Sequence, residues 1–205
     1  MTRWAKIIIK GALLLLFICM TLLCSGCKGS KKQQAVRKLS ENLRGDYTCE
    51  ISFTVPEGSS ELCGNAQITR SGTTTTLDIH EPEPFAGMSI EYDVKGLPSS
   101  VAVHFLGIDT AVPSEALSRV NSIAVLFADD FASSIEKIAP ESMIEYELEN
   151  GSTGCCASVP YGDAEVTLYF DEVTGIPLLL EYRSDNINTD IIFDHFNPLV
   201  EKNEE

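Results

Sequence analysis

The chain has few basic residues. Fifteen lysines and arginines stand against 30 aspartates and glutamates, and the formal net charge is −15 over 205 residues. Nucleic-acid binders need basic faces, so this balance argues against a nucleic-acid partner. The acidity fits solubility beside a surface better than an acidic binding site. The length suffices for one domain with a substantial core.

Residues that carry catalysis or bind metals are also scarce. The three histidines, His80, His104 and His195, belong to no recognisable nucleophile–base arrangement and do not lie at ligand spacing from a cysteine. The acidic pairs at 81–83 and 129–130 are explained by a proline-interrupted loop and a solvated helix face. No glycine-rich phosphate loop occurs. We therefore expect a protein that is not an enzyme, with no metal and no cofactor.

The N-terminal apolar run is short. Gly11–Leu23 contains 13 residues, whereas a spanning helix needs roughly 20. Arg3, Lys6 and Lys10 make its start basic, and no acidic residue precedes Glu41. A basic start, a short apolar core and small residues at the end predict a secretory signal peptide. The alternative is a membrane-anchoring helix lengthened by residues 7–9.

The end of this segment, LCSGC at residues 23–27, resembles the bacterial lipobox. Small Ser25 and Gly26 directly precede Cys27, although Cys24 stands where leucine is more usual. The resemblance implies that residues 1–26 are removed, and that Cys27 receives a lipid anchoring the chain to the extracytoplasmic face of the cell membrane. Residues 27–33 would then be a tether and residues 199–205 a flexible tail.

Residues 34–198 are expected to form one α+β domain. Helical spacing predicts a helix over residues 34–43 and a longer one over 114–138, which Pro140 ends. Period-two alternation and short turns predict antiparallel strands. These strands cover residues 47–54, 62–68, 73–79, 88–94, 101–108, 143–148, 155–159, 164–170, 176–182 and 189–193.

The stretch VTLYFDEVTGIPLLLEY, residues 166–182, resembles the strand–turn–strand unit of the LolA-like lipoprotein carrier superfamily. The acidic turn with Thr174-Gly175 and the apolar-Pro-Leu step at Pro177-Leu178 carry this resemblance. It implies a strongly curved antiparallel sheet, a half-barrel, wrapped over one or two amphipathic helices. It also implies an apolar cavity between the two layers.

The cavity would be lined by large apolar side chains of the strands and of the longer helix. The candidates are Ile90, Tyr92, Val101, Val103, Phe127, Leu168, Phe170, Leu178 and Leu180. Burial of acyl chains there would be driven by roughly 0.8 kcal/mol per methylene. The same residues would equally suit an ordinary packed core, and the pattern alone does not separate the two.

Four cysteines remain after the signal and Cys27, and an even number outside the cytoplasm suggests disulfides. Cys49 and Cys63 flank a turn symmetrically and are candidates for one bridge. Their alternation argues against it, because the two fall on opposite faces unless Gly64 forms a bulge.

Two functions remain open from the sequence. The first is a lipid-anchored, non-catalytic protein that binds an apolar ligand such as a lipid or an acylated protein, and it includes a carrier role. The second is an envelope interaction or sensor domain without a ligand cavity.

Overall fold

A computed structural model describes residues 31–57, 60–95, 100–113, 123, 125–185 and 187–199. The signal segment, Cys27 and the start of the tether lie outside these residues. The strands are β1 (Tyr47–Glu57), β2 (Ser60–Ser71), β3 (Thr74–Glu81), β4 (Met88–Asp93), β5 (Ser100–Phe105), β6 (Ile108–Pro113), β7 (Ile144–Glu147), β8 (Thr153–Tyr161), β9 (Ala164–Asp171), β10 (Pro177–Arg183) and β11 (Asn188–Pro198).

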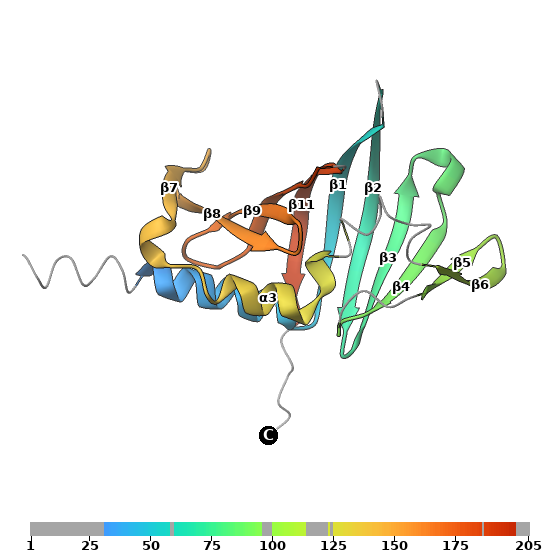
Figure 1. Cartoon of the computed structure of the whole chain (residues 1–205), viewed down its shortest axis with the longest axis horizontal. Helices are drawn as coiled ribbons and strands as arrows, with labels where there is room; N and C mark the ends of the chain where they lie inside the picture. The colour runs from blue at the N-terminus through green and yellow to red at the C-terminus, as the bar shows by residue number, and fades with distance from the viewer. Residues whose placement is uncertain are drawn as a thin grey trace, which may run out of the picture.

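The eleven strands form one antiparallel sheet in the order β6-β5-β4-β3-β2-β1-β11-β10-β9-β8-β7. Every neighbouring pair except β1–β11 is also consecutive in sequence, as short turns between alternating segments predict. The β1–β11 pairing joins the two halves of the meander at the centre of the sheet (Figure 1). The expected α+β class with an antiparallel sheet is confirmed.

The sheet is not the strongly curved half-barrel that the resemblance implied. It opens across the molecule from β7 at one edge to β6 at the other (Figure 1). An apolar sheet face must be buried against another layer. Five of the six β6 residues are exposed, so this end of the sheet has no core to wrap.

A helix over residues 31–44 lies beside the sheet and confirms the first predicted helix. Ala35, Val36, Leu39 and Leu43 are buried on one stripe. The helix ends where the Gly45 amide donates to the carbonyl of Glu41. None of the described helices combines the length and hydropathy needed to cross a bilayer.

The prediction of one long helix over residues 114–138 is wrong in its second half. The 3-10 helix η3 (Val125–Phe127) is separated from α3 (Asp129–Ile135) by Ala128, which has extended backbone. The break coincides with a hydrogen bond from the Asp129 amide to the carbonyl of Val94. Most of the first half lies outside the described residues. The expected apolar stripe is still buried, at Phe127, Phe131 and Ile135.

The predicted strand 101–108 is confirmed as far as Phe105 and wrong beyond it, because a hairpin turn follows. Leu106 and Gly107 both have positive φ, 52° and 77°, and connect β5 to β6. Two consecutive residues with positive φ are typical of a tight two-residue hairpin turn. The apolar run FLGI concealed this turn in the sequence.

The candidate disulfide between Cys49 and Cys63 is absent. Cys49 is opposite Ile68 and Cys63 is opposite Thr54, so the two thiols lie at different points of the β1–β2 ladder. Cys49 is buried, Cys63 is exposed, and all four described cysteines are free. The alternation argument was the correct one, because the register shift on β2 falls at Asn65–Ala66 against β3 and leaves the β1 pairing regular.

Candidate ligand-binding interior

The sheet and the helices enclose one apolar cluster. It contains eight of the nine predicted cavity residues: Ile90, Tyr92, Val101, Val103, Phe127, Leu168, Phe170 and Leu180. The ninth, Leu178, lies at a register shift of β10 and is only partly buried. The cluster also contains the buried stripes of helix 31–44 and α3. Eight of the nine predicted residues therefore share one layer, between the sheet and the helices.

The inner face of β1–β4 is arranged in rows that cross the strands. We call Cys49, Ile68, Leu77 and Ile90 the first apolar row, because they pair in register and are all buried. The second apolar row consists of Ile51, Ala66, Ile79 and Met88. On one strand, successive rows are two residues apart, or roughly 7 Å.

A third row of the same inner face is polar. It consists of Tyr47, Arg70, Thr75 and Tyr92, which pair in register from β1 to β4. We call this set the polar row. All four residues are at most 3% exposed. Four buried atoms of the row lack a hydrogen-bond partner: the two tyrosine hydroxyls, the Arg70 Nε and the Thr75 Oγ1.

The buried tyrosines of the polar row are held as neutral phenols. Burial raises the pKa of both Tyr47 and Tyr92, and for Tyr47 the nearby Arg70 opposes that rise. The Tyr92 ring also lies 5.6 Å from the ring of Phe127, between centroids. Both hydroxyls therefore keep their protons and remain available as hydrogen-bond donors.

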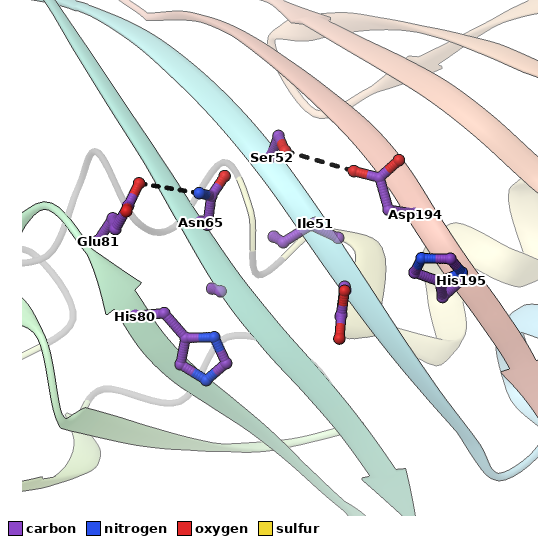
Figure 2. Close-up of a pocket in the computed structure, with 9 residues that line it drawn as sticks. Ile51, Ser52, Asn65, His80, Glu81, Asp194 and His195 are labelled. Carbon is purple, nitrogen blue, oxygen red and sulfur yellow. Dashed lines mark hydrogen bonds between the residues drawn. The ribbon is translucent and has the colours of Figure 1, made fainter.

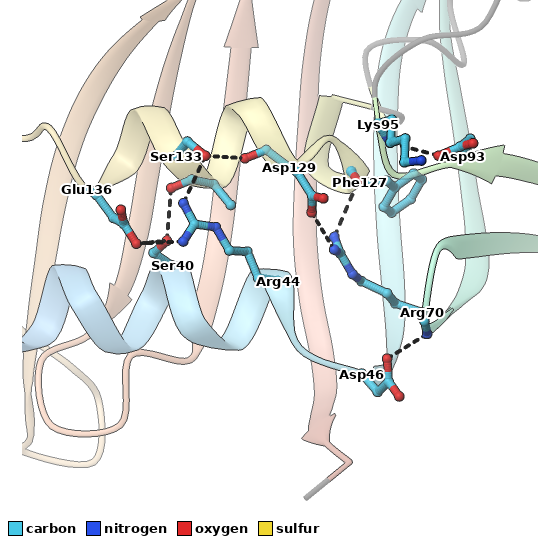
Figure 3. Close-up of polar contacts among 12 residues, drawn as sticks. Ser40, Arg44, Asp46, Arg70, Asp93, Lys95, Phe127, Asp129, Ser133 and Glu136 are labelled. Atoms are coloured by element: carbon cyan, nitrogen blue, oxygen red, sulfur yellow. Dashed lines mark hydrogen bonds and ion pairs between the residues drawn. The ribbon is translucent and has the colours of Figure 1, made fainter. Parts of the chain in front are cut away.

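Arg70 connects the polar row to the helical layer. Its Nη1 donates to the carbonyl oxygen of Phe127 at 3.3 Å, and its Nη2 lies 2.6 Å from Oδ1 of Asp129 (Figure 3). The Asp129 side chain is 47% exposed, whereas that of Arg70 is 3% exposed. The sequence suggested that Asp129 lies on a solvated helix face, whereas its carboxylate is only half exposed and bonds to Arg70. The polar row lies beside a partly open rim.

A second polar cluster holds the two helices to one another. The buried Ser40 hydroxyl donates to the carbonyl of Ala132 at 2.9 Å. Arg44 pairs with Glu136 at 2.8 Å and also donates to the Ser133 hydroxyl (Figure 3). Helix 31–44 and α3 are thus joined by directional contacts.

The opposite, outer face of the sheet carries a hollow of about 500 Å³ across β1, β2, β3 and β11. Its wall is mostly polar (Figure 2). Asn65 donates to Glu81 at 2.9 Å, and Ser52 donates to Asp194 at 3.3 Å. The hollow is lined by Glu50, Ser52, Asn65, His80, Glu81, Asp194 and His195. Ile51 and Ala66, which are buried and belong to the second apolar row, also border it. No group of three or more possible metal ligands occurs among the residues that the structure describes.

Arg70 and Thr75 were not among the residues predicted from the sequence to contact a ligand. Arg70 continues the inward alternation of Ala66 and Ile68, and this parity was the available signal. Thr75 belongs to a run of four threonines that reads as a solvent-facing strand. Its burial depends on its register opposite Arg70 and Tyr92.

Comparison with solved structures finds chains similar to this one at low sequence identity. One match is a LolA superfamily protein from Nitrosomonas europaea, with 10% identity and a TM-score of 0.42 over 82% of this chain and 93% of that one. LprF from Mycobacterium bovis has 13% identity and a TM-score of 0.44 over 83% of this chain and 95% of that one. The lipoprotein LppX from Mycobacterium tuberculosis has 8% identity and a TM-score of 0.43 over 82% of this chain and 96% of that one. No family model and no curated protein matches the sequence.

Proposed function

We propose that the protein is a lipid-anchored extracytoplasmic lipoprotein whose α+β domain binds an apolar ligand, a lipid or an acyl group, between the sheet and the helices. The ligand would lie on the inner face of the sheet, beneath the helical layer. The proposal includes a carrier role, in which an acylated molecule is taken up from one membrane surface and released at another.

The observation that carries this proposal is the single apolar cluster between the two layers. It reaches from helix 31–44 across the inner face to Val101 and Val103 on β5. An acyl chain inserted along this layer would lose water contact at roughly 0.8 kcal/mol per methylene. The Arg70–Asp129 ion pair joins the helical layer to the sheet, and the Ser40–Ala132 hydrogen bond joins the two helices to each other.

Photo-crosslinking tests the proposed ligand site. The full chain in detergent would be irradiated with a long-chain hydrocarbon bearing a diazirine, and adducts would be mapped by proteolysis and mass spectrometry. We expect adducts on inner-face residues of β1–β4. Ala66→Leu, which fills the second apolar row, should reduce them, whereas the matched outer-face change Asn65→Leu should not. Adducts confined to exposed residues would refute the proposal.

Anchoring through Cys27 is supported by the lipobox-like sequence LCSGC. Metabolic labelling with a fatty acid should label the wild-type chain and not Cys27→Ala. The matched control is Cys24→Ala, which should still be labelled. Unchanged labelling and unchanged detergent partitioning of Cys27→Ala would show that the lipid is not attached there.

A second candidate function is favoured by one observation at the edge of the sheet. Leu106 and Ile108 are 81% and 66% exposed at the tip of the β5–β6 hairpin. Exposed apolar residues beside an edge strand are typical of protein interaction sites. In this case Leu106→Ser with Ile108→Ser would abolish capture of an envelope partner and leave hydrocarbon crosslinking unchanged.

A further inference from the structure

We propose that the polar row of Tyr47, Arg70, Thr75 and Tyr92 binds the carbonyl-type oxygen at the head of an acyl ligand. The hydrocarbon chain of that ligand would lie along the first and second apolar rows. This inference rests on the proposed function and adds an orientation and a chemical class to the ligand.

The polar row brings several unpaired polar atoms together in one place. Buried polar groups in folded proteins nearly always have a hydrogen-bond partner, and an unpaired one destabilises the folded state. In the polar row, four atoms on four adjacent strands lack one. Because the row members pair in register, neighbouring side chains start about 5 Å apart on the same face.

The unpaired atoms of the polar row call for a hydrogen-bond acceptor as their partner. The Arg70 Nε–H can only donate, and the three hydroxyls can donate as well. Burial keeps both tyrosines protonated by raising their pKa. Arg70 adds a positive charge, which Asp129 balances from the rim. A set of donors beside a guanidinium favours an acceptor oxygen, such as that of a carboxylate or an ester carbonyl, and disfavours an amine.

The order of the rows along the strands gives the ligand a direction. The polar row lies next to the first apolar row, and the second apolar row follows. Asp129, half exposed and bonded to Arg70, places the polar row at the rim of the interior. An amphipathic ligand with its oxygen at the polar row would therefore extend its chain over the two apolar rows.

The test compares two photoactivatable probes on the full chain in detergent. One is palmitic acid with a diazirine in the chain, and the other is the matching hydrocarbon without a head group. Tyr92→Phe and Thr75→Val each delete one unpaired hydroxyl and preserve shape. We expect each to reduce sub-saturating adduct formation by the acid about tenfold. Adduct formation by the hydrocarbon should remain unchanged.

Tyr161→Phe is the matched control, because Tyr161 borders the same apolar cluster on β8 and lies outside the polar row. It should leave both probes unaffected. The methyl ester of the acid probe separates the two oxygen types. If the two variants reduce adduct formation by the ester and by the acid equally, the polar row binds a carbonyl oxygen. If they reduce adduct formation by the acid alone, the polar row binds a carboxylate.

Two results would overturn the inference in distinguishable ways. If the hydrocarbon labels the interior but neither variant changes acid labelling, the polar row does not bind a head group, although the proposed function stands. Raised thermal stability in both variants would then show that the hydroxyls of Tyr92 and Thr75 are unpaired polar groups in a packed core. If neither probe labels the interior of the wild type, the proposed function fails together with this inference.

Discussion

Arg70 and Asp129 join the sheet to the helical layer across 59 positions of sequence, with Nη2 and Oδ1 2.6 Å apart. The guanidinium is almost fully buried and the carboxylate is half exposed. The contact lies where η3 gives way to α3, next to the hydrogen bond between the Asp129 amide and Val94. These contacts therefore hold the start of α3 against β2 and against Val94, which follows β4.

Asp129→Ala should lower the free energy of unfolding by about 2 kcal/mol, because it leaves the buried Arg70 guanidinium with the Phe127 carbonyl alone. Chemical denaturation measures this change. The adjacent, exposed Asp130→Ala is the control and should change the free energy by less than about 0.5 kcal/mol. Equal effects of the two substitutions would show that the Arg70–Asp129 ion pair does not stabilise the contact between β2 and α3.

Gly64→Ala should destabilise the protein by more than about 2 kcal/mol. A Cβ at this position would overlap the carbonyl oxygen of Glu81 and the ring of Phe53, which is opposite Gly64 in the β1–β2 register. Gln67→Ala on the same strand is the control. A melting temperature of Gly64→Ala equal to that of the wild type would contradict the close packing of Phe53 over β2.

Alkylation should proceed at different rates at Cys49 and Cys63, the two cysteines that were candidates for a disulfide. Cys63 is exposed, whereas burial raises the pKa of the Cys49 thiol to about 12. Because the thiolate is the reactive form, Cys49 should be alkylated slowly at pH 8 and faster as the pH rises. Mass spectrometry after iodoacetamide treatment measures both rates. A species linking Cys49 to Cys63 without reductant would contradict the observed register.

His104 should titrate above its usual range. Its Nδ1 lies 2.8 Å from Oδ1 of Asp109, and this hydrogen bond raises the pKa of the imidazole. Since the folded pKa is raised, the stabilisation is fully present below the unfolded pKa of about 6.5 and is lost as pH rises through the folded value. NMR titration should show a lower His104 pKa in Asp109→Asn.

The control for this titration is Glu91→Gln. The Glu91 carboxylate lies 3.8 Å from the Nε2 of His104, farther than Asp109 lies from Nδ1. Its removal should therefore lower the pKa of His104 less than Asp109→Asn does. The reverse order would contradict the cross-strand pairing of His104 with Asp109.

The strands could be predicted because alternation is a local property of the sequence. Tyr47, Cys49, Ile51 and Phe53 alternate with polar residues, and the structure buries all four. The stripe of Phe127, Phe131 and Ile135 was identified in the same way. Such patterns determine which side chains face the core, whatever the remainder of the chain does.

The remaining features depend on contacts between distant segments. The break at Ala128 coincides with contacts to Val94 and Arg70, which helical spacing does not reveal. Leu106 and Gly107 form the β5–β6 turn, although the sequence around them reads as one apolar strand. The polar row exists only through the registers of four strands, since Thr75 alone looks like a solvent-facing residue.

Native mass spectrometry of the full chain purified from membranes tests the ligand-binding proposal most directly. The same sample measured under denaturing conditions gives the mass of the covalent protein, including any lipid at Cys27. We predict a native mass that exceeds the denatured mass by one lipid or fatty acid, and a smaller share of this complex in Ala66→Leu. A native mass equal to the denatured mass, with no lipid in the organic extract, would contradict the account.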